Sequence, residues 1–143
     1  MIKLITAETF YRLSERRKRI SFDVDRHHLQ KEPLKVLRIF FTLKNCFPYA
    51  KITVHRTAHG FHVKAVNEKI ADIPLEKRVS IRETLGDDYP RVEYDKLKIR
   101  LGLPYFVDTL FSTKFYPNGT IGHEEKCNPI ALPWISKIPS KKG

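Results

Sequence analysis

The chain has 143 residues, of which 41% are hydrophobic and 11% aromatic, so it fits one domain and is not disordered throughout. Lysine and arginine number 27 against 16 aspartates and glutamates, a formal net charge of +11. Such an excess is self-repulsive unless a polyanion balances it, and nucleic acid is the commonest such partner because each neutralised phosphate releases counterions. The alternatives are a solvated basic surface or a patch that binds acidic protein or lipid.

Cysteine usage and the absence of apolar runs indicate the compartment. Cys46 and Cys127 form neither a metal-binding spacing nor a disulfide framework, which favours a reducing environment. The N-terminus lacks the apolar run of a signal peptide, and the longest apolar patch, residues 39–41, is too short to span a bilayer. We therefore expect a cytoplasmic protein with no membrane partner. Its small size suggests a virus-infected or plasmid-bearing host cell, and its 30% of charged residues suggests a thermophilic source.

The chain begins with a segment, residues 1–18, that predicts a short helix or arm. It leads into the basic run Arg16, Arg17, Lys18 and Arg19. This run is a candidate nucleic-acid contact, although a solvated connector has the same composition.

Regular elements follow from residue 20 onward. Residues 20–25 alternate apolar and polar side chains and predict a half-buried strand. After a polar loop over residues 26–32, Pro33 suits the first turn of a helix that runs to Phe47.

Residues 51–66 predict a β-hairpin with His59 and Gly60 as its two-residue turn, in which Gly60 tolerates a positive φ. This register pairs His55 with Lys64 across the hairpin. It separates an apolar face from a polar face, and the polar face carries His55, Thr57, His62 and Lys64.

The C-terminal half is less regular. A second helix is predicted from Pro74 to Gly86, because glycine is common just past a helix C-terminus. Residues 87–103 fit a strand or a helix, and residues 107–115 predict a last strand. The tail contains several prolines and is expected to be an extended arm anchored by Trp134. The predicted organisation is an arm over 1–18, an α+β domain over 19–116 and a tail over 117–143.

This order of elements, β-α-β-β-α-β, is the ferredoxin-like or RRM-like order. Both helices would cover one face of the sheet and leave the other face open. In the usual arrangement the first and third strands are central neighbours, which places Asp23 and Asp25 beside His62 and Lys64 on the open face.

Paired carboxylates on that face suggest metal chemistry. Side chains at positions i and i+2 of a strand point the same way, so Asp23 and Asp25 can share one or two divalent ions. Such ions activate an attacking oxygen and stabilise a leaving phosphate. The candidate nucleotide- or phosphate-binding residues are His62, Lys64, His55 and Arg56.

The run FDVD at 22–25, followed by HRTAHGFHVKAV at 55–66, resembles the archaeo-eukaryotic primase superfamily. Asp23-Val24-Asp25 is similar to the family's Asp-x-Asp motif, and Gly60-Phe61-His62 to its Gly-x-His motif. The third motif, a single Asp after a hydrophobic residue, is matched loosely by Asp95, with Asp108 as a competitor. The resemblance covers residues 19–104. It implies an RRM-like catalytic core and template-directed joining of nucleotides with Mg²⁺ or Mn²⁺. The chain departs from the family because it is short for a complete core and shows no zinc module.

Three other functions stay open. The chain can be an inactive descendant that keeps the fold, or a non-catalytic RRM-like DNA- or RNA-binding protein. An RRM reader usually carries exposed aromatics on its central strands, and these are missing here, so binding would use backbone phosphates. A replication-initiator nuclease of the HUH type needs His-hydrophobic-His, and His62-Val63-Lys64 lacks the second histidine.

Structural roles compete for the same residues. Asp23 or Asp25 can form an ion pair or cap a turn. The neighbouring side chains of His27 and His28 are expected to diverge rather than share a metal. Asp87 and Asp88, after Gly86, are expected to be solvated loop residues.

Overall fold

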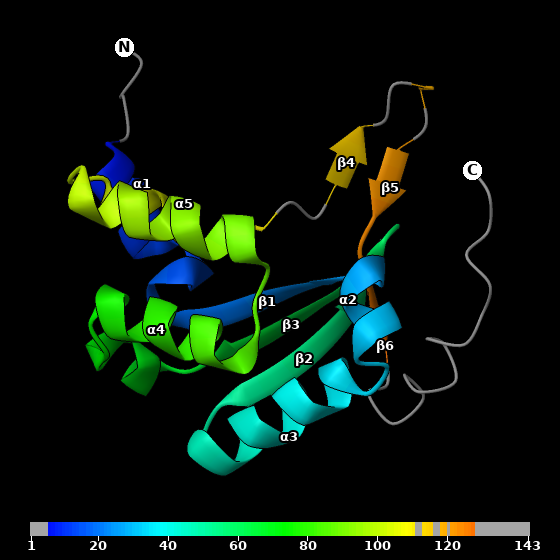
Figure 1. Cartoon of the computed structure of the whole chain (residues 1–143). Helices are drawn as coiled ribbons and strands as arrows, with labels where there is room; N and C mark the ends of the chain where they lie inside the picture. Colours follow the sequence, from blue (N-terminus) through cyan, green and yellow to red (C-terminus); the bar gives the residue numbers. More distant parts are fainter. Residues whose placement is uncertain (1–5, 111–112, 116–117, 120, 128–143) are drawn as a thin grey trace.

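The computed structural model describes residues 6–110, 113–115, 118–119 and 121–127. Within them the protein is α+β, with a four-stranded antiparallel sheet of order β1-β3-β2-β6 and a separate pair of strands, β4 and β5 (Figure 1). The strands are β1 (Arg19–Asp25), β2 (Lys51–Arg56), β3 (Gly60–Val66), β4 (Thr113–Phe115), β5 (Ile121–His123) and β6 (Glu125–Cys127). The α-helices are α1 (Ala7–Leu13), α2 (Arg26–Lys31), α3 (Lys35–Cys46), α4 (Leu75–Leu85) and α5 (Tyr89–Arg100). Single 3₁₀ turns cover Glu15–Lys18, Glu68–Asp72 and Pro104–Phe106.

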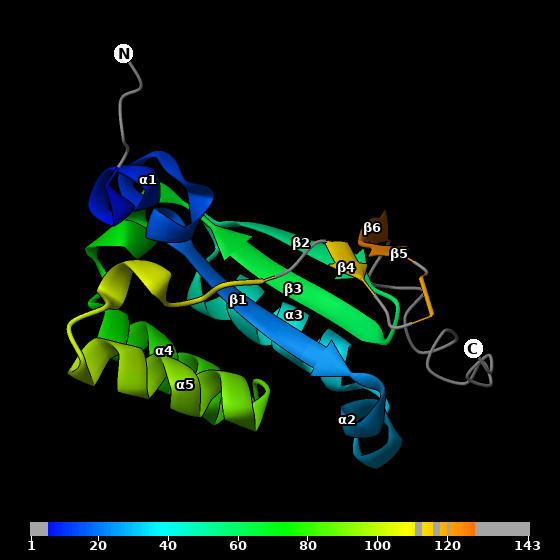
Figure 2. The same ribbon diagram turned by 90° about the horizontal axis from the view of Figure 1, so that it is seen from above.

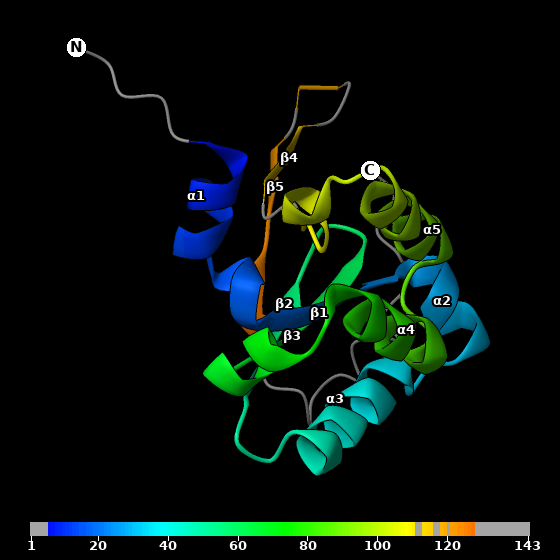
Figure 3. The same ribbon diagram turned by 90° about the vertical axis from the view of Figure 1, so that its left-hand side faces the viewer.

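Alternation along β1 builds the core face of the sheet, as predicted. Ile20, Phe22 and Val24 are fully buried and pack with apolar side chains of α3 and of the hairpin. Figure 3 shows α3 and α4 next to each other on this side, with α5 beyond α4. The strand predicted over 20–25 and the helix predicted from Pro33 to Phe47 are confirmed within a residue or two at each end.

The predicted hairpin forms, but its turn lies one residue earlier in the chain. His55 pairs with His62, and Thr57 N–H donates to the Gly60 carbonyl, so Ala58 and His59 are the turn residues. The pairing shift is two residues, and the predicted faces are therefore kept, because side chains alternate with a period of two.

Gly60 serves a close approach rather than a positive φ. A Cβ at Gly60 would lie 2.0 Å from the carbonyl oxygen of Val24 on β1. Only glycine lets β1 and β3 approach at this point. The prediction of a left-handed Gly60 is wrong, because this residue begins β3 instead of closing the turn.

Two helices form in segments that were predicted as a loop and as either a strand or a helix. Residues 26–31 form α2 instead of a loop, because the Asp25 side chain accepts from the His28 backbone N–H and the His28 side chain accepts from Asp25 N–H, a capping box. The ambiguous segment forms α5, which begins at an Asp88 N-cap and has Pro90 in its first turn. The helix predicted to end at Gly86 is confirmed as α4, and Gly86 has φ +90°.

The ferredoxin-like order of strands is not found in the described residues, because no described strand pairs with the edge of β1 opposite β3. Side chains satisfy this edge instead: Asp87 accepts from the Asp23 N–H at 2.9 Å, and Arg91 donates to the Ser21 carbonyl at 3.0 Å. The last strand predicted over 107–115 is reduced to β4, which pairs with β5 outside the main sheet. Residues 107–110 instead cross the face of β1 that points away from α3 (Figure 2).

The predicted tail, which starts at residue 117, contributes the strand β6 to the sheet. β6 pairs with β2, from Val54 opposite Cys127 to Arg56 opposite Glu125. Trp134 and the rest of residues 128–143 lie outside the described residues. Among the described helices, none has both the length and the apolar content needed to cross a membrane.

Candidate anion-binding site

Three strands bring predicted polar residues together on the face away from the core. The register places Asp23 beside His62, and His62 beside His55. One row along the sheet it places Lys64 between Ser21 and Thr53. The prediction that Asp23 and His62 share a sheet face is confirmed.

These side chains converge on one carboxylate, Glu124, which lies between β5 and β6. Lys64 Nζ donates to Glu124 Oε1 at 2.7 Å, and His62 Nδ1 lies 2.8 Å from Glu124 Oε2. His55 Nδ1 lies 3.7 Å from Oε1. On the other side of the imidazole, Asp23 Oδ1 lies 3.7 Å from His62 Nε2. We call His55, His62 and Lys64 the sheet-face donor cluster.

The cluster holds Glu124 in its charged form. Burial alone would raise the pKa of the Glu124 carboxyl, but hydrogen bonds from Lys64 and His62 outweigh burial and hold that pKa below its ordinary value. An ionised carboxylate only accepts hydrogen bonds, so His62 Nδ1 carries a proton and donates it to Glu124. Burial, and then the neighbouring Lys64 ammonium, lower the pKa of His55, whose imidazole is neutral at pH 7.

The sheet face is not open, contrary to the prediction. His62 is only 1% exposed because Glu124 covers it. Ser21 is buried under Asp108, whose segment crosses β1. The side chains of Lys64 and Glu124 are 14% and 13% exposed, so both still reach the surface in part.

Asp25 belongs to a different cluster from Asp23. One ligand-type atom from each of Asp25, His27, His28 and Asp88 lies within 4.8 Å of the others, so the side chains of His27 and His28 do not diverge as predicted. Structural contacts explain the positions of Asp25, His28 and Asp88. Asp25 and His28 form the capping box of α2, and Asp88 caps α5. His28 Nδ1 accepts from the Asp25 N–H at 2.9 Å, so the neutral ring keeps its proton on Nε2 and offers no free lone pair to a cation.

The residues fit the implied Mg²⁺ or Mn²⁺ poorly. Asp23 is not a member of the one group of potential ligands found among the described residues, whereas Asp25 is. Asp23 thus lies beside the sheet-face donor cluster, whereas Asp25 lies in the group with His27, His28 and Asp88. Asp88 is the second carboxylate of the group that holds Asp25, and this group lacks Asp23, so we derive no chemical step through a metal.

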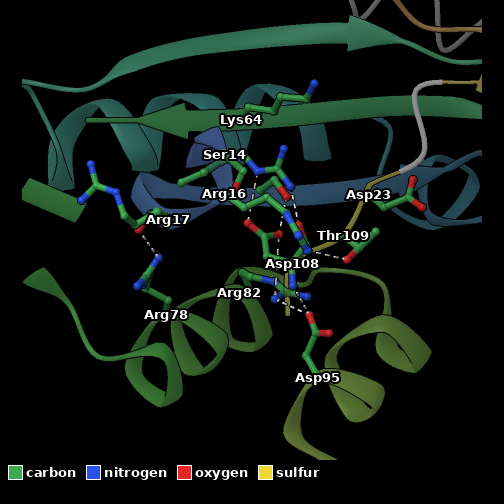
Figure 4. Close-up of polar contacts among 12 residues, drawn as sticks. Ser14, Arg16, Arg17, Asp23, Lys64, Arg78, Arg82, Asp95, Asp108 and Thr109 are labelled. Atoms are coloured by element: carbon green, nitrogen blue, oxygen red, sulfur yellow. Dashed lines mark hydrogen bonds and ion pairs between the residues drawn. The ribbon is translucent and has the colours of Figure 1, made fainter. Parts of the chain in front are cut away.

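Both candidates for the third carboxylate, Asp95 and Asp108, lie in a buried network of three arginines and three aspartates. Figure 4 shows part of it, with Arg82 beside Asp95. Arg82, 1% exposed, donates to Asp95 at 2.7 Å and to Asp87 at 2.8 Å. Asp108 accepts from Ser21 and Arg91 and pairs with Arg19 at 3.3 Å. Asp87, expected to be a solvated loop residue, is buried here and also binds Arg91 at 2.6 Å. We call Arg19, Arg82, Arg91, Asp87, Asp95 and Asp108 the buried charge network.

Mutual neutralisation keeps Asp108 and Arg91 charged despite their burial. Burial alone would raise the pKa of the Asp108 carboxyl, but Arg91, Arg19 and Arg82 outweigh burial and hold that pKa below its ordinary value. Burial alone would lower the pKa of Arg91, and the carboxylates of Asp108 and Asp87 raise it instead. Because the network balances its own charges, the net +11 of the chain is carried by residues outside it.

The other predicted contacts are not brought to the donor cluster. Within the basic run, Arg17 and Lys18 pair with Glu68, Arg16 donates to Thr109, and Arg19 is buried against Asp108. These residues tie the N-terminal segment to the domain. Arg56 alternates onto the core side of β2, at its exposed end opposite Phe61.

Glu124 is the site residue that sequence reasoning missed. It lies in the segment predicted to be an extended arm, 60 residues after Lys64, and no local pattern connects the two. Asp87 was missed for a related reason. A polar pair after a helix-ending glycine is typical of a loop, and its burial comes from contacts with Arg82 of α4 and with the Asp23 N–H of β1.

Comparison with known proteins finds no matching family model, no matching curated protein and no matching solved structure. The resemblance to the primase superfamily therefore stays a prediction.

Proposed function

We propose that the protein binds nucleic acid through phosphate groups, and that the sheet-face donor cluster forms part of the contact. The convergence of Lys64 and His62 on a single anion, Glu124, carries this proposal. Carboxylate and phosphate oxygens accept the same charge-assisted hydrogen bonds. Donors that are arranged around a carboxylate are therefore also arranged for a phosphate.

Charge around the cluster supports the same partner. Lys51 alternates onto the same face of β2 as His55, and Lys126 of β6 lies directly opposite His55. Both lysines are exposed. They extend the cluster into a basic stripe across β2 and β6, which suits a polyanion better than a single small acid.

The chemistry of this face favours phosphate contacts over base stacking. The outward positions of β1, β2 and β3, all of them described, carry no Phe, Tyr or Trp. Proteins that read single-stranded bases stack them on aromatic side chains. We therefore expect little sequence preference and a strong dependence on salt.

Fluorescence anisotropy with labelled single-stranded and duplex oligonucleotides tests this function. We expect affinity to fall steeply between about 50 and about 200 mM salt, with a slope of roughly −0.9 per neutralised phosphate on duplex DNA and about −0.7 on single strands. Binding that does not change with salt, or no binding at the lowest ionic strength, would remove the proposal.

A metal-dependent nucleotidyltransferase of the primase type is the second candidate. It is favoured by one observation: the two motif-bearing strands are neighbours, and Asp23 Oδ1 lies 3.7 Å from His62 Nε2. The division of Asp23 and Asp25 between two clusters weighs against it.

Nucleotide incorporation with Mg²⁺ or Mn²⁺ tests this second candidate. Either ion should raise the melting temperature of the wild type, and the double variant Asp23→Asn, Asp25→Asn should lose both this response and the incorporation. The control is Asp72→Asn, which replaces an exposed carboxylate. Without a metal-dependent shift and incorporation in the wild type, the enzyme proposal ends and the binding proposal stands.

A further inference from the structure

We propose that Glu124 occupies the phosphate subsite of the sheet-face donor cluster and that a phosphate group displaces it. This inference rests on the proposed function and names the group that competes with the ligand. The two carboxylate oxygens of Glu124 are divided among the donors: Oε1 faces Lys64 and His55, and Oε2 faces His62. A phosphate group in this position would face the same three side chains.

The donor residues stand on strands paired within the sheet, whereas Glu124 lies between the short strands β5 and β6. His62 and Lys64 stand on β3, which has a paired strand on each side, and His55 stands on β2. Glu124 comes from a short segment that, within the described ranges, joins the sheet through the three residue pairs of β6. Its side chain already reaches the surface. Rotation of one side chain into water would open the subsite without moving the sheet.

Other carboxylates near the cluster do not fill this position. Asp23 approaches His62 at Nε2, the opposite ring nitrogen from the one that Glu124 binds. Glu15 acts on His55 only as a nearby charge. A phosphate that replaced Glu124 would therefore meet Lys64, His55 and His62 Nδ1, and no second acid is found between them in the part of the chain that the structure describes.

Substitution of Glu124 beside its neighbour Glu125 isolates this effect. Glu124→Gln removes the competing charge, and Glu125→Gln makes the same change in net charge on an exposed β6 residue for which no contact with the cluster is found. Two probes are compared by calorimetry: inorganic tripolyphosphate, and a short oligonucleotide with a 5′-hydroxyl, which carries only internal phosphodiesters. Melting curves show whether each variant is folded. Glu124→Ala is a second variant that lacks the competing carboxylate.

We expect Glu124→Gln to tighten binding about tenfold, the size of one charge-assisted hydrogen bond, and Glu125→Gln to stay within about threefold of wild type. Adding Lys64→Gln should cancel the gain. Tightening with both probes identifies backbone phosphates as the ligand, and tightening with tripolyphosphate alone identifies the terminal phosphates of a nucleotide.

Equal effects of the Glu124 and Glu125 substitutions on both probes would overturn the subsite. This result is distinguishable from failure of the proposed function. If the proposed function fails, the wild type binds no oligonucleotide at low salt, while the comparison of variants with tripolyphosphate still reports on the subsite.

Discussion

Asp95 accepts hydrogen bonds from Arg82 Nη1 at 2.7 Å and from the backbone N–H of Asp108 at 3.1 Å, and these contacts decide what its substitution does. Asp95→Asn leaves a guanidinium that is 1% exposed with less negative charge around it. Breaking a buried ion pair on one side costs roughly 3–5 kcal/mol. We expect a loss of this size in the free energy of unfolding, measured by urea titration.

Asp72→Asn, in an exposed 3₁₀ turn, is the control for this substitution and should change the free energy of unfolding by less than about 0.5 kcal/mol. If Asp95→Asn were as stable as wild type, the structural role of Asp95 would be refuted and its catalytic role would gain support.

Asp108 makes a second residue-scale prediction, on acid stability. Its pKa in the folded protein lies below the ordinary value of 3.8, because neighbouring arginines outweigh burial. A carboxyl with a lowered folded-state pKa contributes stability that is fully present above the unfolded pKa and is lost as pH falls through the folded pKa. The wild type should therefore lose stability steeply below pH 3.8.

Asp108→Asn should flatten this acid dependence. Asparagine suits the position because Asp108 has φ +62°, a backbone conformation that asparagine tolerates. The measurement is the free energy of unfolding by urea at a series of pH values below neutrality. Parallel curves for wild type and variant would show that Asp108 does not contribute to the loss.

At the scale of elements, the contact between β1 and β3 depends on Gly60. Gly60→Ala places a Cβ 2.0 Å from a backbone oxygen, which cannot move aside as a flexible side chain could. We expect destabilisation at or above the upper end of the roughly 1–3 kcal/mol that overpacking costs. Gly102→Ala, with open space but φ +74°, should cost only about 1–2 kcal/mol. Thermal unfolding of both variants makes the comparison, and the reverse order would contradict the close approach.

The elements that the sequence predicts well are those whose signal is local. Alternation over 20–25 and the apolar face of the helix after Pro33 follow from residues within one element, and both are confirmed. Helix α2 also has a local signal, the capping box of Asp25 and His28, but residues 26–32 were predicted to be a loop. The failure at 107–115 has a different cause, because a strand needs a partner edge, and the edge of β1 is already satisfied by Asp87 and Arg91.

At the scale of the whole molecule, the sequence predicts one side of the candidate site. His55, His62 and Lys64 were assigned to one face by alternation alone, and the register confirms this. Glu124 contacts Lys64, which lies 60 residues earlier in the chain. The buried charge network includes the pair Arg19 and Asp108, which are 89 residues apart. No periodicity in the sequence encodes such contacts. The net charge indicates the class of partner without indicating which surface binds it.

The salt dependence of oligonucleotide binding by Lys64→Gln tests the central claim most directly, because it asks whether this face, and not the charge of the chain as a whole, contacts phosphate. The matched control is Lys77→Gln, which removes the same charge from an exposed position on α4, in the helical layer. The account predicts that Lys64→Gln makes the slope of log affinity against log salt less negative by about 1, while Lys77→Gln leaves the slope at its wild-type value. Equal slopes for the two variants would contradict the assignment of phosphate binding to the sheet-face donor cluster.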